Sequence, residues 1–296
     1  MISGMQGLGD NLYQRAVLQS CGKNVVLQTS WPQIYSDLPN VKCVKPVTRL
    51  RTQWKNVLRS EFANATGYRQ MQWSYCADPS LSILESLARR LNVPTPTEMT
   101  GPEFRFTRIT ERPYILVRPA CLRREWVSNS RNPKPEYIAE AIEHLRKDFT
   151  IVSVADLELG QEWALEPLPY ADITLHKGEL PVEQLLSVVR NAEGLVGGVG
   201  WIVPAALAYK VPLFLIYGGW GSTNSPRRII GSLDASFIDQ VIPDEFCMCS
   251  SNIHECNKNV SDFSGRARSF AAELVQRAHL AAGVGDRVVP GDCATV

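Results

Sequence analysis

The first residue whose type and position suit chemistry is Asp10. It follows glycines at positions 4, 7 and 9 and precedes residues 11–20, whose apolar positions predict a helix. A carboxylate at a helix start is commonly an N-cap or first-turn acid, which the helix dipole favours. The same carboxylate can also take a proton from a hydroxyl group as a general base. Position alone favours the capping role, so a catalytic role needs support from elsewhere in the chain.

A second glycine-rich turn, Gly198-Val199-Gly200, lies in the apolar stretch of residues 194–221. It separates a predicted buried strand from a helix that we expect to begin at Trp201 and to end at residue 209. Backbone N–H groups at such a helix start point to one spot with the helix dipole behind them, which makes a ready phosphate site. The alternative is that the glycines only turn the chain tightly. Trp201 suits either stacking on a base or sugar or burial at the helix start.

The same stretch is long and apolar enough to span a bilayer. Pro204, Pro212 and the repeated glycines interrupt it, and its flanks carry no basic bias. Strands of a parallel sheet that is buried on both faces also read as continuous apolar runs. We therefore expect buried strands and no membrane span.

The composition is that of a globular protein without a strong charge preference. The 296-residue chain is 45% hydrophobic and carries 31 basic and 30 acidic residues. This balance makes no demand for nucleic acid or an anionic membrane as a partner. The N-terminus lacks the basic and apolar regions of a signal peptide. Eight cysteines without framework spacing indicate free thiols in a reducing compartment, so we expect a cytoplasmic location.

Strands alternate with helices in both halves of the chain. Strands are expected over residues 1–3, 24–29, 41–45, 114–118, 150–154, 173–176 and 211–217, and another begins at residue 194 and ends in the glycine turn of residues 197–200. Helices are expected over residues 11–20, 80–91, 136–147, 181–191, 201–209 and 264–282. Residues 49–75 are expected to be helical and irregular, and residues 119–135 and 222–232 to be loops. The pattern predicts an α/β fold of two Rossmann-like domains, residues 1–105 and 106–282, with a tail over residues 283–296. For the last helix two placements stay open, one within the second domain and one packed back on the first. Ligands of such sheets bind at the carboxyl ends of strands, and hence in a cleft between the domains.

Several familiar sites are absent from the sequence. The first glycine loop reads GxxGxGD and not GxGxxG, and residues 25–30 contain no acid to bind a ribose, so we expect no nicotinamide or flavin cofactor. No Walker A, HExxH or GxSxG motif occurs.

Cys247, Cys249 and Cys256, with His254, could ligate zinc, but C-x-C-x6-C is not a standard spacing. We expect free thiols there and no metal.

Four segments resemble glycosyltransferase family nine, the heptosyltransferases of lipopolysaccharide synthesis. They are GMQGLGDNLYQRAVLQ, YILVRPACLRREW, the whole stretch of residues 194–221, and CMCSSNIHECNK before the last helix. In the second segment a basic residue precedes Trp by two places, as in the family, and that residue is Arg124. The chain departs from the family's Asp-Ser/Thr-Gly-x-x-His pattern at the donor turn, where it has Gly198 to Val203. Side-chain contacts to the donor must therefore differ from those of the family.

The resemblance implies a GT-B type, metal-independent, inverting glycosyltransferase. Asp10 would be the general base on the acceptor hydroxyl, and the diphosphate of a UDP-, ADP- or GDP-linked sugar would bind the N–H groups at Gly198 and Gly200. Arginines would neutralise the leaving diphosphate in place of a metal; for Arg123 and Arg124 the alternative is a solvated loop. The candidate substrate-binding residues are Gly7, Gly9, Asn11, Arg118, Arg123, Arg124, Gly198, Val199, Gly200 and Trp201.

Three functions stay open at this point, and the oligomeric state is not predicted. The first is transfer to a saccharide or glycan acceptor. The second is transfer to a modified base in DNA, motivated by a basic and aromatic cluster that is otherwise a solvated helix face. That cluster comprises Arg49, Arg51, Trp54, Lys55 and Arg59. The third is a nucleotide-binding protein without catalysis, motivated by the missing side chains at the donor turn.

Overall fold

The computed structural model describes residues 1–64, 71–76, 78–105 and 109–285. The predicted domain boundary at residue 105 adjoins residues 106–108, and most of the predicted tail lies at residues 286–296; these segments are outside the described residues, as are residues 65–70 of the predicted irregular region.

The first part of the chain forms a parallel four-stranded sheet in the order β3-β2-β1-β4. Its strands are β1 (Ile2–Ser3), β2 (Val25–Gln28), β3 (Val41–Val44) and β4 (Met71–Gln72). The helices of this part are α1 (Leu8–Cys21), the 3-10 helix η1 (Pro32–Tyr35), α2 (Arg51–Leu58) and α3 (Ile83–Leu91). Ser82 caps α3 through a reciprocal capping box with Glu85, so the helix begins at Ile83 and not at residue 80 as predicted.

The second part forms a parallel six-stranded sheet in the order β12-β11-β10-β5-β7-β9. Its strands are β5 (Tyr114–Val117), β7 (Thr150–Val154), β9 (Ile173–Leu175), β10 (Gly194–Gly198), β11 (Leu213–Ile216) and β12 (Ile238–Val241). The helices are α4 (Pro135–Leu145), α5 (Val182–Arg190), α6 (Ile202–Tyr209), α7 (Gly221–Asn224), α8 (Pro226–Ile229) and α9 (Phe263–Gly285). A small antiparallel pair, β6 (Cys121–Arg123) and β8 (Glu162–Ala164), lies beside this sheet.

Each parallel sheet has a point where the direction of winding reverses. In the first sheet, β2 and β3 lie on one side of β1 and β4 on the other, so the chain switches between β1 and β4. In the second sheet, β7 and β9 lie on one side of β5, and β10 to β12 on the other, so the switch falls between β5 and β10. Ligands of open α/β sheets bind outside the carboxyl ends of strands at such points.

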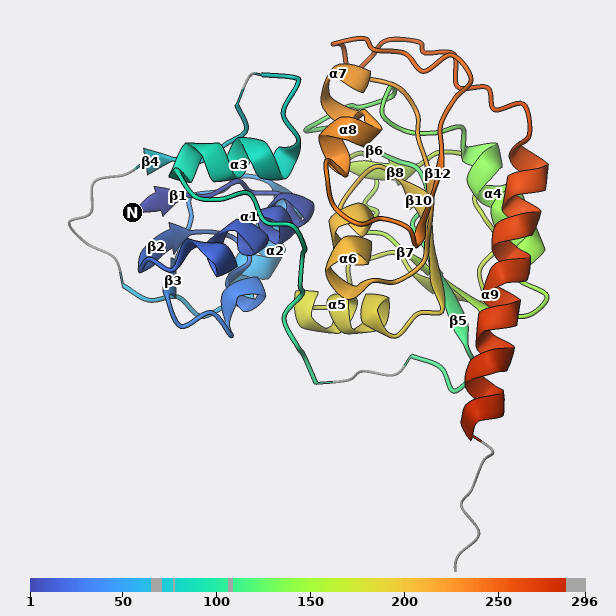
Figure 1. The fold of residues 1–296 in the computed structure, drawn as a ribbon, viewed down its shortest axis with the longest axis horizontal. Helices are drawn as coiled ribbons and strands as arrows, with labels where there is room; N and C mark the ends of the chain where they lie inside the picture. The colour runs from blue at the N-terminus through green and yellow to red at the C-terminus, as the bar shows by residue number, and fades with distance from the viewer. Residues whose placement is uncertain (65–70, 77, 106–108, 286–296) are drawn as a thin grey trace, which may run out of the picture.

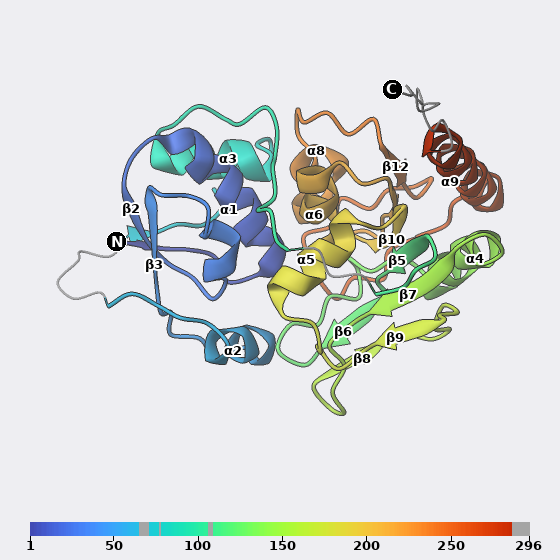
Figure 2. The same cartoon turned by 90° about the horizontal axis from the view of Figure 1, so that it is seen from below.

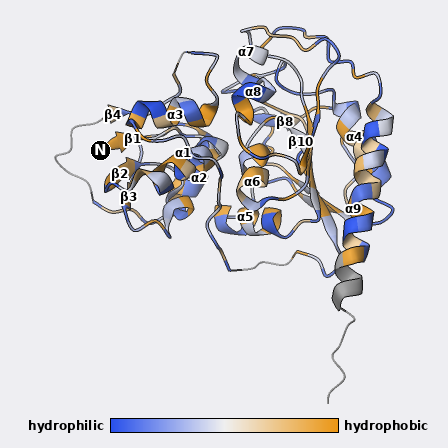
Figure 3. Cartoon of the chain, in the orientation of Figure 1, coloured by the Kyte–Doolittle hydropathy of each residue, from blue (hydrophilic) through white to orange (hydrophobic). Residues whose placement is uncertain are grey.

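One hydrophobic cluster extends through both parts of the chain. It joins residues of α1 and α3, such as Leu12 and Leu87, to residues of β10 and α6, such as Leu195 and Val203. In Figures 1 and 2, α5, α6 and α8 lie on the face of the second sheet that is turned toward α1. A second cluster packs α4 and α9 against the opposite face of that sheet. Figure 3 shows hydrophobic residues along α6, and seven of the eight residues of this helix are buried.

Several element boundaries differ from the sequence prediction. The structure begins α1 at Leu8 and not at residue 11, because the N–H of Asn11 donates to the carbonyl of Gly7 at 3.1 Å and closes the first turn there. Gly9 and Asp10 therefore belong to the helix and not to a loop.

The predicted loops also contain regular structure. Residues 119–135 include β6, and residues 222–232 include most of α7 and all of α8. The strands β8 and β12 were not predicted from the sequence. For β12 the reason is that its sequence, Ile-Asp-Gln-Val, lacks a continuous apolar run. Among the described residues, none of the helices combines the length and the apolar character that crossing a bilayer requires.

Candidate active site

A pocket of about 300 Å³ lies where the two switch points meet. Its walls come from the residues that follow β1, β4, β5 and β10, and from α2 and the start of α5. This volume lies at the lower end of the range for small-molecule sites. Most of the predicted site residues line it: Gly7, Gly9, Asp10, Arg118, Arg123, Gly198, Val199, Gly200 and Trp201. Asn11 and Arg124 are not among the lining residues.

Asp10 is the third residue of α1 and faces the pocket. A backbone hydrogen bond from Gly7, the N-cap residue, reaches its carboxylate, and Tyr75 Oη donates to Asp10 Oδ1. Burial raises the pKa of Asp10 above its ordinary value, and the hydrogen bond from Tyr75, the charge of Arg131 and the Gly7 backbone oppose that rise. A carboxylate with a raised pKa and a hydrogen-bonded orientation is suited to accept a proton.

Tyr75 is a site residue that the sequence analysis did not identify. It lies three residues past β4 and lines the pocket. The guanidinium of Arg228 lies 5.7 Å from the centroid of the Tyr75 ring, and Arg228 also donates to the carbonyl of Cys76 at 3.2 Å. Burial and then the neighbouring charge of Asp10 raise the pKa of Tyr75 well above its usual value, so its hydroxyl keeps the proton that it donates. The only sequence signal was its place after a strand of two residues, which is too short to recognise.

Asn11 supports the glycine loop from behind. It is fully buried, and its Nδ2 donates to the carbonyls of Met5 at 2.9 Å and Gly7 at 2.8 Å. Its Oδ1 accepts from Thr29 Oγ1 at 2.7 Å and from Tyr35 Oη at 2.8 Å. With its side-chain hydrogen bonds used inside the protein, Asn11 shapes the loop on which Asp10 depends and does not face a ligand.

Arg118 and Arg123 share one buried acid. Glu162, on β8, is 2% exposed and lies 2.9 Å from Arg123 Nε and 3.6 Å from Arg118 Nη2. Arg51 of α2 is also 3.5 Å from this carboxylate. Arg51 also pairs with Asp156 and Glu158, whereas Arg118 and Arg123 share Glu162, so positive charge remains at the pocket wall.

Arg131 is another basic residue of this wall. No ion pair to Arg131 occurs within the part of the chain that the structure describes, and its buried Nε has no hydrogen-bond partner. Its guanidinium lies 4.9 Å from the ring centroid of Trp126, and it lines the pocket. Burial, together with the charges of Arg118 and Arg123, lowers the pKa of Arg131 to about 10, which leaves it charged at neutral pH. The sequence analysis placed Arg131 in the loop but not in the candidate set, because its burial was not visible.

Arg124 lies away from the pocket. Its backbone N–H donates to the carbonyl of Gln161 at 2.8 Å beside the β6–β8 pair, and its side chain is exposed. The resemblance singled out this residue, but the structure places Arg118, Arg123 and Arg131 at the pocket and not Arg124.

The turn after β10 opens onto the pocket at the start of α6. A Cβ added at Gly200 would meet nothing within 4 Å, whereas one added at Gly198 would lie 2.7 Å from Pro133 Cδ. Gly200 therefore leaves space on the pocket side, and Gly198 permits close packing. Trp201 is half-buried, and the guanidinium of Arg118 lies 5.8 Å from its ring centroid. The backbone N–H groups that begin a helix here attract anions.

The basic cluster of α2 is largely engaged within the protein. Arg51 Nη1 and Lys55 Nζ lie 2.9 Å and 2.7 Å from Asp156 Oδ1, which belongs to the second part of the chain. Arg59 Nη1 donates to the carbonyl of Gly178 at 3.5 Å. These contacts hold α2 against the second sheet and reduce the charge that a DNA backbone could use.

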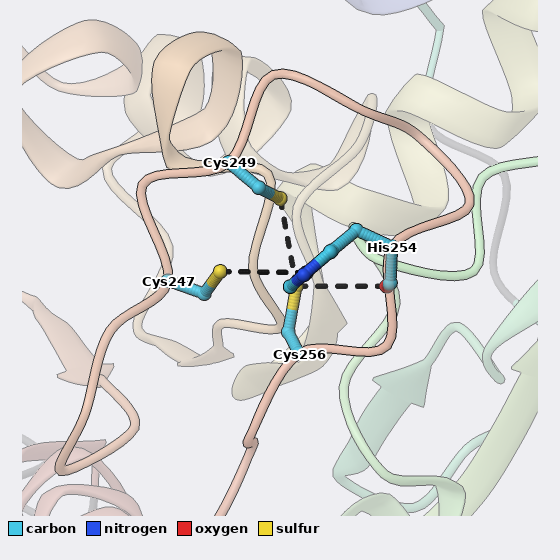
Figure 4. Close-up of side chains that lie close together, drawn as sticks. All are labelled: Cys247, Cys249, His254 and Cys256. Carbon is cyan, nitrogen blue, oxygen red and sulfur yellow. Dashed lines mark hydrogen bonds between the residues drawn. The ribbon is translucent and has the colours of Figure 1, made fainter.

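The cysteines near the last helix are gathered away from the pocket lining. The ligand atoms of Cys247, Cys249, His254 and Cys256 all lie within 4.8 Å of one another, and their spacing led us to expect free or packed thiols without a metal. The structure shows an arrangement that could hold a metal ion (Figure 4).

Comparison with known proteins identifies the fold. No protein-family model matches the sequence, and no curated protein matches it. Similar solved structures include the iron-containing dodecameric glycosyltransferase TibC from enterotoxigenic E. coli H10407, with a TM-score of 0.61 and 16% identity over 95% of this chain and 76% of TibC. They also include a family 9 glycosyltransferase from Veillonella parvula, with a TM-score of 0.58 and 12% identity over 93% and 97% of the two chains. E. coli ADP-heptose LPS heptosyltransferase II gives a TM-score of 0.56 and 12% identity over 94% and 98%.

The mixed α/β architecture with parallel sheets is thus consistent with the GT-B class of glycosyltransferase folds. Within that class, the chain has a heptosyltransferase-like family 9 fold, as the sequence resemblance predicted.

Proposed function

We propose that this protein is a glycosyltransferase that moves a sugar from a nucleotide-sugar donor to an acceptor hydroxyl with inversion. In this proposal the two sheets are the two lobes of a GT-B enzyme, residues 1–105 and 106–282, with the pocket as the cleft between them. The main support is Arg131, a partly buried residue whose Nε is buried without a hydrogen-bond partner, which has no ion pair among the described residues and which lines the same pocket as Asp10. A buried, unpaired cation is costly unless an anion binds it.

The donor's diphosphate would bind between the start of α6 and the arginines. The N–H groups at Gly198 and Gly200 and the guanidinium groups of Arg118 and Arg131 would stabilise the negative charge that develops on the leaving group. No metal is needed for that task where arginines supply the charge. Arg123 would contribute less, because Glu162 already pairs with it at 2.9 Å.

Asp10 would act on the acceptor from the opposite wall. As the acceptor oxygen attacks the anomeric carbon, its proton passes to the Asp10 carboxylate. The bond from the anomeric carbon to the diphosphate oxygen breaks, and the nucleoside diphosphate leaves with the electron pair. Attack from the face opposite the leaving group inverts the anomeric centre. Tyr75 would orient Asp10 through the hydrogen bond to Oδ1.

An ADP-linked sugar is the first donor to test. TibC is also known in complex with ADP-D-beta-D-heptose, in a structure with a TM-score of 0.59 and 15% identity to this chain. UDP- and GDP-linked sugars stay in the panel, because the donor turn from Gly198 to Val203 lacks the family's acidic residue and histidine. We propose a saccharide or glycan acceptor and a cytoplasmic location.

A nucleotide panel with a transfer assay tests this proposal. A nucleoside diphosphate or nucleotide sugar that binds the native state at 100 times its Kd should stabilise it by about 2.7 kcal/mol, seen as a higher unfolding temperature. Selective stabilisation would identify the donor nucleotide. A flat response across ADP, UDP, GDP and their sugars would contradict the proposal.

The variant Asp10→Asn separates an enzyme from a nucleotide-binding protein without catalysis. We expect transfer to fall by about 10²- to 10⁴-fold, because the base is lost, while nucleotide binding persists. Burial raises the folded-state pKa of Asp10 above 3.8, so its ionised form opposes folding at neutral pH, and the variant should unfold at no lower temperature. Any stability that the variant gains over the wild type should disappear as the pH falls through about 3.8, because the wild-type carboxyl is then protonated in both the folded and the unfolded state.

Glu85→Gln is the matched control, because Glu85 holds the same third position in α3 that Asp10 holds in α1. We expect this control to lose stability and to keep its transfer rate. Undiminished transfer by Asp10→Asn would show that Asp10 is not the base.

A further inference from the structure

Cys247, Cys249, His254 and Cys256 form a cluster, the cysteine knuckle, in the segment between β12 and α9. Cys249 Sγ lies 3.6 Å from Cys256 Sγ, and His254 Nδ1 lies 3.6 Å from Cys247 Sγ and 3.4 Å from Cys256 Sγ. Figure 4 shows the four side chains pointing toward one another from two arms of a loop. No carboxylate belongs to the cluster among the described residues.

Three of the six separations, at 3.4–3.6 Å, are close to the edges of a tetrahedral metal site, and all six lie within 4.8 Å. Zinc binds cysteine sulfur at about 2.3 Å and histidine nitrogen at about 2.0–2.1 Å, so the ligand atoms of a tetrahedral site are separated by roughly 3.5–3.8 Å. Three thiolates and one imidazole are among the common donor sets of structural zinc sites. The C-x-C-x4-H-x-C spacing is unusual, and only the folded loop brings the four side chains together.

Backbone N–H groups are directed at two of the sulfur atoms. The N–H of Cys249 donates to Cys247 Sγ, and the N–H of Trp220 donates to Cys256 Sγ. Such bonds orient the sulfur atoms, which is the usual role of the groups that surround a metal's ligands.

The knuckle packs directly behind the loop that carries Arg131. A Cβ added at Gly219 would lie 2.3 Å from Cys256 Sγ, so only glycine fits there, and the N–H of Gly219 donates to the carbonyl of Ser130. Ser130 Oγ donates to the carbonyl of Ser251 at 2.7 Å, and the N–H of Ser130 donates to the carbonyl of Asn252 at 3.1 Å. The side chain of Asn252 in turn donates to the carbonyl of Val127. The knuckle and residues 127–132 are thus one hydrogen-bonded unit.

We propose that Cys247, Cys249, His254 and Cys256 bind one structural metal ion, with zinc as the ion that this donor set fits best, and that the ion fixes the loop that presents Arg131 to the pocket. The metal site stands on its own geometry, whereas its effect on ligand binding rests on the proposed function.

Metal analysis of the purified full-length protein tests the site. Cells are grown with added zinc and iron, and the protein is purified without chelators. Elemental analysis should find one equivalent of zinc or iron per chain in the wild type, and which element is found identifies the ion. Cys249→Ser should contain at most about one-tenth of the wild-type metal, because one of the four ligands is removed. Cys21→Ser is the control, because Cys21 is a partly exposed cysteine at the end of α1, outside the cluster, and it should keep the full equivalent.

A second measurement covers the case in which Cys249→Ser fails to fold. Cobalt added to reduced, chelator-treated wild-type protein should produce the intense visible absorption of tetrahedral thiolate coordination, and zinc should abolish it. A metal-free wild type that also takes up no cobalt would overturn the proposal. So would a disulfide between Cys249 and Cys256 in the purified protein, detected by mass spectrometry of the unreduced, alkylated chain.

The positioning effect is measured separately from the metal content. Removing the ion should weaken binding of the nucleotide found in the panel by about tenfold, corresponding to one lost charged hydrogen bond, and adding zinc back should restore it. Arg131→Gln should already bind about tenfold more weakly and should not respond to metal removal. Unchanged affinity in the metal-depleted wild type would overturn the positioning role and leave the metal site standing. If no nucleotide binds, the proposed function fails while the elemental analysis still decides the site.

Discussion

The contacts of Asp10 suit both interpretations that its position in the sequence left open, a first-turn acid of a helix and a general base. Its carboxylate accepts from the Gly7 backbone at the start of α1, as a first-turn acid does, and it also accepts from Tyr75. The two interpretations that the sequence left open are therefore compatible. A side chain held from two directions presents one orientation to a substrate, which is what a general base requires.

Tyr75→Phe should change the pH dependence of transfer. The hydrogen bond from Tyr75 lowers the pKa of Asp10 against the dominant effect of burial, so its loss should raise that pKa further. The acidic limb of kcat/KM, where the base becomes protonated, should lie above pH 3.8 in the wild type and move to higher pH in the variant. The measurement is a pH–rate profile. Tyr170→Phe is the control, because Tyr170 donates to Asp172 at 2.7 Å in a similar pair outside the pocket lining. An unshifted limb in Tyr75→Phe would remove Asp10 from the role of base.

Arg131 and Arg124 offer a direct contrast between tertiary position and sequence resemblance. Arg131→Gln should weaken nucleoside diphosphate binding by about 10- to 100-fold, because a hydrogen bond to a charged group contributes about 1.5–3 kcal/mol. Arg124→Gln should change the affinity by less than about twofold, since its side chain is exposed and away from the pocket. Isothermal titration of both variants checks this. A larger loss of affinity in Arg124→Gln than in Arg131→Gln would show that Arg124, the residue that the resemblance selected, contributes more to nucleotide binding.

The starts of α1 and α6 meet at Gly9. A Cβ added there would lie 3.0 Å from Trp201 Cα and 3.3 Å from Pro204 Cγ. Gly9 thus allows the helix that carries Asp10 to approach α6, whose start lines the pocket. The two glycine-rich turns, residues 4–9 and 198–200, are at least 189 residues apart in the sequence. They line the same pocket only because these two helices pack together.

Two alanine substitutions should separate packing from binding. Gly9→Ala should lower stability by about 1–3 kcal/mol, because backbone of α6 must move to admit the methyl group, and lower the unfolding temperature by several degrees. Gly200→Ala should leave stability nearly unchanged, since its Cβ would meet no protein atom within 4 Å, and should weaken nucleotide binding by projecting into the pocket. Thermal unfolding with and without nucleotide measures both effects. Equal stability losses in the two variants would contradict this account.

The molecule as a whole should unfold in a single step. Its larger hydrophobic cluster includes residues of α1, α3, β10 and α6, and so couples the two sheets. The ion pairs of Arg51 and Lys55 with Asp156 add a second connection. Calorimetry should show one transition with equal calorimetric and van't Hoff enthalpies. Two resolved transitions would show that residues 1–105 and 106–282 are independent domains.

The order of elements was largely predictable from the sequence. Apolar runs such as residues 114–117 and 213–216 predict strands because both faces of a parallel sheet are buried. The edge strand β12 was missed because its Asp239 and Gln240 break that pattern. The two-residue strands β1 and β4 carry too few residues for any periodicity, and only their pairing in the sheet defines β4.

From its local patterns alone, the chain reveals an α/β fold, two glycine-rich turns before helices and an acid at the first of them. Those features depend on spacing between near neighbours, which a sequence displays directly. Only the tertiary structure decided which arginines line the pocket and that Tyr75 donates a hydrogen bond to Asp10. It also brought together three cysteines and a histidine whose spacing in the sequence is unusual. Each of these depends on burial and on contacts between segments distant in the chain, because two elements must pack before their side chains can meet.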